Sequence, residues 1–263
     1  MSTESAAGQE QLSRIEGLAA GIMPDLLGFR KLDVQAKTDF AYFLATMFAR
    51  SPAQLRQIAA HYAATAHWAG SHELEFENRQ KMKDGLLTDD DLKVQDFLLD
   101  RNNYAIDVDR RVGLLAFKQC ETLAKLMVQM TWTFELSENQ ELLTSENCVI
   151  WVNGGPERVT GPYGFGLGHR QAVIPFPLSP KVILRLDWLP GAGWSKHRLD
   201  KKRARLANQY QAKHKNRFLY YRTRDEGFRI LGMKYAEPVN QLDSGVNAPE
   251  IFVVRKLKGQ PYR

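Results

Sequence analysis

The stretch Trp132–Val152, WTFELSENQELLTSENCVIWV, decides the fold class, because the spacing of apolar residues changes here. Upstream of it, apolar side chains recur at helical intervals. Within it, β-branched and aromatic residues gather in short runs, which predict strands at about 132–136, 142–144 and 148–152. The sequence therefore predicts helices first and a sheet afterwards, an order typical of an α+β protein.

Helix signals fill the residues before this stretch. Apolar residues from Leu12 to Leu26 recur every three or four positions, which predicts an amphipathic helix. Asp33, Ser51 and Thr88 can each cap the start of a further helix, and the helix after Ser51 should end near Trp68. We expect the longest helix to be the last one, with a broad apolar face. The predicted helices span about 9–27, 33–48, 51–68, 88–98 and 107–130.

The residues after the stretch predict three more strands and one basic helix. The strands are expected at about 172–177, 182–186 and 251–257, and the helix at 198–213. We expect a single domain over residues 9–258. Its helical half, 9–131, should pack on a mainly antiparallel sheet in a strand-rich half, 132–258, which carries the basic helix.

Composition limits the class of protein. With 263 residues, 44% of them hydrophobic and 25% charged, the chain can bury a sizeable core, and wholesale disorder is excluded. No apolar run is long enough to span a bilayer, and the polar stretch 1–10 does not resemble a signal peptide. Cys120 and Cys148 are predicted to be buried free thiols, so we expect a cytoplasmic protein.

Charge is unevenly distributed along the chain. The net charge of +6 permits a polyanionic partner without requiring one. Residues 73–100 are rich in acids, whereas Lys196–Arg217 is basic. Lys201, Lys202 and Arg203 of this basic region could contact nucleic-acid phosphates, and the alternative is a solvated helix face. The sequence indicates no other partner.

A run of four polar side chains, Thr144–Asn147, follows a predicted strand directly. In a functional interpretation, Glu146 is a general base or metal ligand, while Ser145 and Asn147 orient a substrate. In the alternative interpretation, these side chains form hydrogen bonds within a turn.

A second candidate pair, Glu16 and Arg50, lies on otherwise apolar helices. The pair could face the same cavity as Glu146, or it could form an ordinary ion pair between helices. The histidines at 61, 67 and 72 lack the i, i+4 spacing of helical metal ligands. The common hydrolase, zinc and redox motifs are missing, so the sequence identifies no metal or cofactor, and whether the protein is an enzyme stays open.

The order of several short motifs resembles a bacterial family catalogued as domain of unknown function 4238. Thr144–Asn147 is followed by Pro177–Pro180, a Pro-Leu-Ser-Pro element, at the spacing typical of that family. The resemblance covers roughly Glu16–Tyr220. Its other motifs are Ile15–Glu16, Arg50–Pro52, Asn208, Ala212 and Phe218–Tyr220.

The resemblance implies a fold and a candidate ligand pocket shared by the family, without an assigned activity. The chain departs from the family pattern at Glu146, where the family has Asp, and at Cys148, where it has Pro. The family's N-terminal paired-histidine and tyrosine element is absent, which predicts a truncated or inactive copy if those histidines do chemistry. The catalytic candidates are Glu146, Asn147, Ser145, Glu16 and Arg50. The binding candidates are Thr144, Ser179, Asn208, Lys201, Lys202 and Arg203.

Two classes of function therefore stay open beside the family-shared pocket. One is a hydrolase that acts on a phosphoester or nucleic acid. The other is a non-catalytic protein that binds nucleic acid through the basic helix. The first requires the catalytic candidates to converge, and the second requires affinity that falls steeply with salt.

Overall fold

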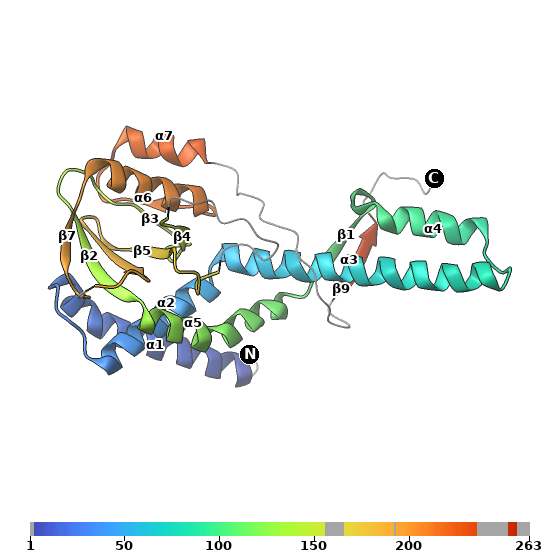
Figure 1. Cartoon of the computed structure of the whole chain (residues 1–263), viewed down its shortest axis with the longest axis horizontal. Coiled ribbons are helices and arrows are strands. Elements are labelled where there is room, and N and C mark those ends of the chain that lie inside the picture. Colours follow the sequence, from blue (N-terminus) through green and yellow to red (C-terminus); the bar gives the residue numbers. More distant parts are fainter. Residues whose placement is uncertain (1–2, 156–165, 192, 236–251, 257–263) are drawn as a thin grey trace. The chain divides into compact units, whose positions relative to one another are not determined.

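A computed structural model describes residues 3–155, 166–191, 193–235 and 252–256, and the chain divides into two compact units. Unit 1 comprises Met1–Gln54 and Ala116–Val239, and unit 2 comprises Leu55–Leu115 and Asn240–Arg263. Figure 1 shows the elements of both. The units are described separately below, and a single domain over 9–258 stays a prediction.

Capping side chains fix where the helices of unit 1 begin. Asp33 accepts a hydrogen bond from the backbone N–H of Ala36 at 2.7 Å and starts α2. Asp200 accepts one from Arg203 at 2.8 Å and starts α6. The helices of this unit are α1 (Thr3–Leu27), α2 (Val34–Ala49), α5 (Cys120–Gln129), α6 (Lys201–His214) and α7 (Glu226–Lys234), together with the start of α3 (Pro52–Lys83).

A five-stranded sheet forms the centre of unit 1. Its order is β4-β5-β6-β2-β7, and only the β2–β7 pair is parallel. A separate short pair joins β3 to β8. The bounds are β2 (Thr131–Ser137), β3 (Thr144–Ser145), β4 (Val152–Asn153), β5 (Ala172–Ser179), β6 (Val182–Asp187), β7 (Lys196–Leu199) and β8 (Leu219–Tyr220).

The two faces of this sheet differ in character because side chains alternate along each strand. On one face, Trp132, Phe134 and Leu184 are fully buried. The ring of Phe40 in α2 packs against Trp132 with centroids 6.1 Å apart. On the other face, Glu135 and Arg185 point toward α6. In Figure 1 the sheet lies between α1, α2 and α5 on one side and α6 and α7 on the other.

Unit 2 combines the rest of α3 with α4 (Asp89–Leu99) and a strand pair. Strand β1 (Tyr104–Val108) pairs antiparallel with β9 (Phe252–Lys256). Thr88 and Asp91 form a capping box at the start of α4. Two 3₁₀ segments complete the path: η1 (Arg101–Asn103), and η2 (Arg110–Gln119), whose chain leads into unit 1.

The predicted long helix over 107–130 was wrong. Its residues belong to β1, η2 and α5 instead. Asp107 pairs with Val253, a partner distant in the sequence, so its strand depends on a tertiary contact that local periodicity cannot show. The longest helix is α3, which continues past Trp68 to Lys83 and is followed by Gly85 at φ +70°.

The strand-rich half agrees with the prediction in most of its elements. The α+β class is confirmed, and so are the strands over 132–136, 172–177 and 182–186. The predicted strand over 148–152 was wrong except at its end, because only Val152–Asn153 pairs, as β4. The basic helix predicted over 198–213 begins only at Lys201, because Lys196–Leu199 pairs with β2 as β7 and Asp200 caps the helix. Neither β7 nor α7 was predicted, so the basic helix is not the only helix after residue 132.

Two expectations from composition concern the thiols and the membrane. Cys120 and Cys148 are both free and buried, as predicted. Among the residues that the structure describes, no helix is both long enough and apolar enough to cross a bilayer.

Candidate ligand pocket on the sheet

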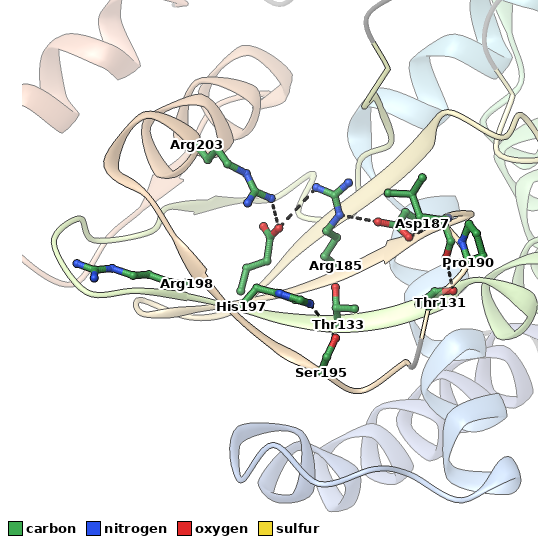
Figure 2. Close-up of a pocket in the computed structure, with 12 residues that line it drawn as sticks. Thr131, Thr133, Arg185, Asp187, Pro190, Ser195, His197, Arg198 and Arg203 are labelled. Carbon is green, nitrogen blue, oxygen red and sulfur yellow. Dashed lines mark hydrogen bonds and ion pairs between the residues drawn. The ribbon is translucent and has the colours of Figure 1, made fainter.

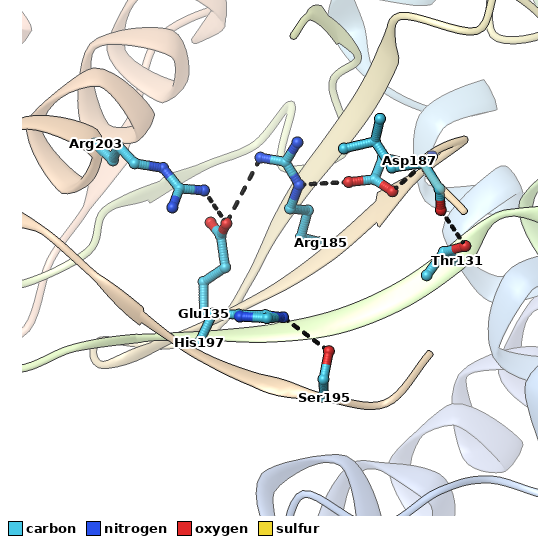
Figure 3. Close-up of polar contacts among 8 residues, drawn as sticks. Thr131, Glu135, Arg185, Asp187, Ser195, His197 and Arg203 are labelled. Atoms are coloured by element: carbon cyan, nitrogen blue, oxygen red, sulfur yellow. Dashed lines mark hydrogen bonds and ion pairs between the residues drawn. The ribbon is translucent and has the colours of Figure 1, made fainter. Parts of the chain in front are cut away.

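Four charged residues meet on the face of the sheet that lies under α6, and we call them the charged network. Glu135 comes from β2, Arg185 and Asp187 come from β6, and Arg203 comes from the first turn of α6. Figure 3 shows these side chains converging from three elements. Alternation along the strands places Arg185 and Asp187 on the same face.

Each carboxylate of the charged network is buried and paired. Glu135 and Asp187 are both 5% exposed. Arg203 donates to Oε1 of Glu135, and a guanidinium nitrogen of Arg185 lies 3.6 Å from the same oxygen. Arg185 Nε donates to Asp187 Oδ2 at 2.6 Å, and the backbone N–H of Leu189 donates to Oδ1 at 3.1 Å. Burial of these charges is tolerated because each has a partner of opposite charge.

The charged network borders a cavity of about 540 Å³, which we call the polar cavity. Figure 2 shows its lining, which comes from β2, β6, β7, the segment between β6 and β7, and the start of α6. Ser195 Oγ lies 2.8 Å from His197 Nε2. Thr133 and Arg198 also contribute to the lining. The polar cavity therefore offers hydroxyl, imidazole and guanidinium groups to one ligand.

A second cavity, of about 360 Å³, shares three members of the charged network with the first. Glu135, Arg185 and Arg203 line both. Much of the remaining lining is apolar or aromatic, so we call it the apolar cavity. Its apolar and aromatic lining residues are Val152, Val173, Pro175, Ile183, Leu199, Leu206, Ala207 and Tyr210.

The structure gives Glu146 and Asn147 partners on the main chain. The carboxylate of Glu146 accepts hydrogen bonds from the backbone N–H groups of Arg217 and Phe218, the latter at 2.9 Å. Asn147 Oδ1 accepts from the N–H of Ala53 at 3.2 Å, and its amide donates to the carbonyl of His214. Asn147 thereby ties the start of α3 to the end of α6.

Ser145 and Asn208 connect the same segment to α6. Ser145 Oγ donates to Gln211 at 3.1 Å. Asn208 Oδ1 accepts from the N–H of Leu143 at 2.9 Å, and its amide donates to the carbonyl of Glu141 at 2.8 Å. The two bonds of Asn208 satisfy backbone groups in the segment just before β3.

Lys201 and Lys202 are exposed at the start of α6, and four further candidates occupy three other positions. Thr144 pairs with Tyr220 in the β3–β8 ladder. Ser179, at the end of β5, accepts from the N–H of Lys181 at 3.2 Å. Glu16 and Arg50 form an ion pair with N and O 2.5 Å apart, and their side chains are 47% and 37% exposed.

The structure thus places Ser145 and Asn147 in contact with α6, where Asn208 bonds the residues just before them, while Arg203 joins the charged network. Neither the polar nor the apolar cavity is lined by Glu146, Asn147, Glu16 or Arg50. Catalytic roles for these residues stay a prediction.

Burial changes the acidity of a thiol beside this segment. Desolvation raises the pKa of Cys148 from its ordinary value of 9.0 to about 11, while the nearby positive charge of Arg50 partly opposes the rise. The Cys148 thiol is therefore neutral near pH 7.

Sequence reasoning missed Glu135, Arg185, Asp187, Ser195 and His197. A signal for three of them was present. Polar residues occupy every second position of β2 from Thr131 on, and Arg185 and Asp187 alternate with apolar residues in β6. Reading that alternation as a polar face would have indicated a site. No comparable signal marks Ser195 or His197, because β7 joins the sheet through a parallel pairing after an irregular segment.

The described residues contain no group of three or more His, Cys, Asp or Glu side chains placed to hold a metal ion. The fold and the site define an α+β protein with an ionic network around two buried carboxylates, between a sheet and a basic helix. A family described as "Protein of unknown function (DUF4238)" matches residues 10–225, and the chain belongs to this family. No curated protein and no solved structure matches the chain.

Proposed function

We propose that the charged network is the binding site for a small anionic ligand, a carboxylate or a phosphoryl compound. The observation that carries this proposal is the meeting of Arg185 and Arg203 on one buried carboxylate, Glu135. Buried ion pairs contribute little net stability compared with apolar side chains of similar size, so stability alone is a poor reason for such a network. Guanidinium groups match the geometry of carboxylate and phosphate oxygens.

Glu135 holds the two arginines in place before a ligand arrives. The Arg203 side chain is 43% exposed, so its unused N–H groups remain accessible from the cavity. An anion that enters the polar cavity can accept from Arg203 and Arg185, while Ser195 and Thr133 supply hydroxyl groups. Because the arginines are already ordered, binding loses little side-chain entropy.

Calorimetric titration with inorganic phosphate and with acetate, at low ionic strength, tests this proposal. Arg203→Gln is expected to weaken binding at least about tenfold, because a charge-assisted hydrogen bond is lost. Arg205→Gln is the matched control. It removes the same charge from an exposed residue of the same helix that lines neither cavity. Equal effects of the two variants, or no binding of either anion, would contradict the proposal.

Hydrolysis of a phosphoester is a second candidate, favoured by the contact between Ser195 and His197 in the polar cavity. His197 Nε2 can take the proton of Ser195 Oγ as this oxygen attacks phosphorus, and can then give it to the leaving oxygen. Bis(p-nitrophenyl) phosphate is a suitable probe. Loss of turnover in Ser195→Ala with retention in Glu146→Gln would support this pair, and the reverse would support the motif residues 144–147.

Nucleic-acid binding by the basic helix is a third candidate. It is supported by the exposure of Lys201 and Lys202 at the start of α6 and of Phe218 and Tyr220 beyond it.

The free thiols and the family motifs support a bacterial, cytoplasmic protein. Cell fractionation would test that location.

A further inference from the structure

We propose that the ligand of the charged network is an amphiphile, with its anionic group at Arg185 and Arg203 and an apolar group in the apolar cavity. This inference rests on the proposed function. Its first support is that Glu135, Arg185 and Arg203 line both cavities. An anion bound to these arginines therefore lies at the border of the apolar cavity, and any substituent on that anion can extend into it.

The helix wall of the apolar cavity changes from charged to apolar along its length. Arg203, Leu206, Ala207 and Tyr210 follow the i, i+3, i+4, i+7 spacing that puts side chains on one helix face. The charged member stands at the start of this stripe, and the aromatic member stands at its end. Leu206 is 44% exposed, although it faces a cavity lined by other apolar groups. Its exposed surface would be removed from water by an apolar substituent.

The sheet wall also places apolar side chains beside the charged ones. On β6, Ile183 precedes Arg185 on the same face, and on β5 Pro175 pairs with Arg185. Val173 and Leu199 add further apolar surface, at 5% and 4% exposed. Each wall therefore presents a cation next to apolar groups, with the Glu135 carboxylate between the two arginines. This complementarity fits one molecule with an anionic end and an aliphatic or aromatic end.

A homologous ligand series tests this inference on the intact chain. Calorimetry would compare methyl, butyl and octyl phosphate, each below its micellar concentration. Each methylene that enters the cavity is expected to lower the Kd about fourfold. Octanoate replaces the phosphate with a carboxylate, so it identifies the preferred anionic group. Octanol keeps the chain and lacks the charge, so it is expected to bind far more weakly than octyl phosphate.

Two variants locate the apolar end of the ligand. Leu206→Ser and Tyr210→Ser are expected to weaken the binding of octyl phosphate more than that of methyl phosphate, so the advantage of octyl over methyl phosphate should fall. Ile230→Ser, an equivalent change at an exposed residue of α7 outside the cavity, is the control. The chain-length series on the unmodified protein gives a result even if a variant fails to fold.

The outcomes separate this inference from the proposed function. Equal affinity for methyl and octyl phosphate would overturn the amphiphile and leave the anion site intact. Equal affinity for octanol and octyl phosphate would overturn the role of the anionic group. Absence of binding throughout the series would overturn the proposed function, and the inference with it.

Discussion

At the residue scale, Glu135 is central to the site. Its carboxylate is 5% exposed and accepts from Arg203 while Arg185 lies beside it. The motif residues Ser145, Glu146 and Asn147 contrast with it, because their described hydrogen bonds join segments of the chain. Glu135 also joins segments of the chain, and it differs from the motif residues in lining the polar cavity.

Removal of the Glu135 carboxylate should destabilise unit 1. Glu135→Ala leaves the partly buried Arg185 with only Asp187 and leaves Arg203 without this partner, so we expect a loss of about 2–4 kcal/mol in the free energy of unfolding. Glu138→Ala is the control, because Glu138 pairs with the exposed Arg198, and it should cost less than about 1 kcal/mol. Urea unfolding followed by tryptophan fluorescence measures both. Similar losses would contradict the central role of Glu135.

Ionisation of the Cys148 thiol should destabilise the folded protein in alkaline solution. Its pKa is about 11 in the fold and has its ordinary value of 9.0 when unfolded, so the folded state favours the neutral thiol. This contribution is fully present below pH 9 and is lost as pH rises from 9 to 11. The free energy of unfolding of the natural chain, minus that of Cys148→Ala, should fall by about 2 kcal/mol between pH 8 and pH 11. Parallel pH curves for the two proteins would show that the thiol is not coupled to folding.

At the element scale, α6 uses two faces for different purposes. Ala204, Asn208, Gln211 and Ala212 are buried, and two of them hydrogen bond the segment around β3. The face that starts at Arg203 lines the apolar cavity. The fold therefore fixes the helix from one side and leaves its other side available to a ligand.

The start of α4 shows how a local signal stabilises an element of unit 2. Thr88 Oγ1 accepts from the N–H of Asp91 at 3.2 Å, and the Asp91 carboxylate accepts from the N–H of Thr88 at 2.9 Å. Thr88→Ala should cost about 1 kcal/mol and speed amide hydrogen exchange in the first turn of α4. Thr38→Ala, in the exposed part of α2, should leave that exchange unchanged. Unchanged exchange in Thr88→Ala would mean that packing, and not the cap, holds α4.

At the scale of the whole molecule, net charge and local charge must be distinguished. The chain carries +6 overall, which attracts any polyanion to some degree. Specific binding along α6 would require particular cations to contact phosphates.

Two double variants with the same net charge separate these effects. Lys201→Gln/Lys202→Gln should lower the slope of log K against log salt by about 1.4 for single-stranded DNA, because two phosphate contacts are lost. Lys83→Gln/Lys118→Gln removes two exposed lysines elsewhere and should leave the slope nearly unchanged. Fluorescence anisotropy with a labelled oligonucleotide measures both slopes. Equal slopes would leave only the general attraction of a basic protein.

The sequence by itself determined the elements whose signals are local. Capping residues such as Asp33 and Thr88 marked helix starts, and runs of β-branched and aromatic residues marked β2, β5 and β6, because both signals arise from neighbours in the chain. The main family motifs could also be recognised, because each is a short run of neighbouring residues.

The tertiary structure alone decided the pairing of β1 with β9 and the parallel addition of β7, because their partners are distant in the chain. It likewise decided the site. Glu135, Arg185 and Arg203 form one network only after β2, β6 and α6 have packed. These residues lie far apart in the sequence, so no local pattern predicts that they contact one another.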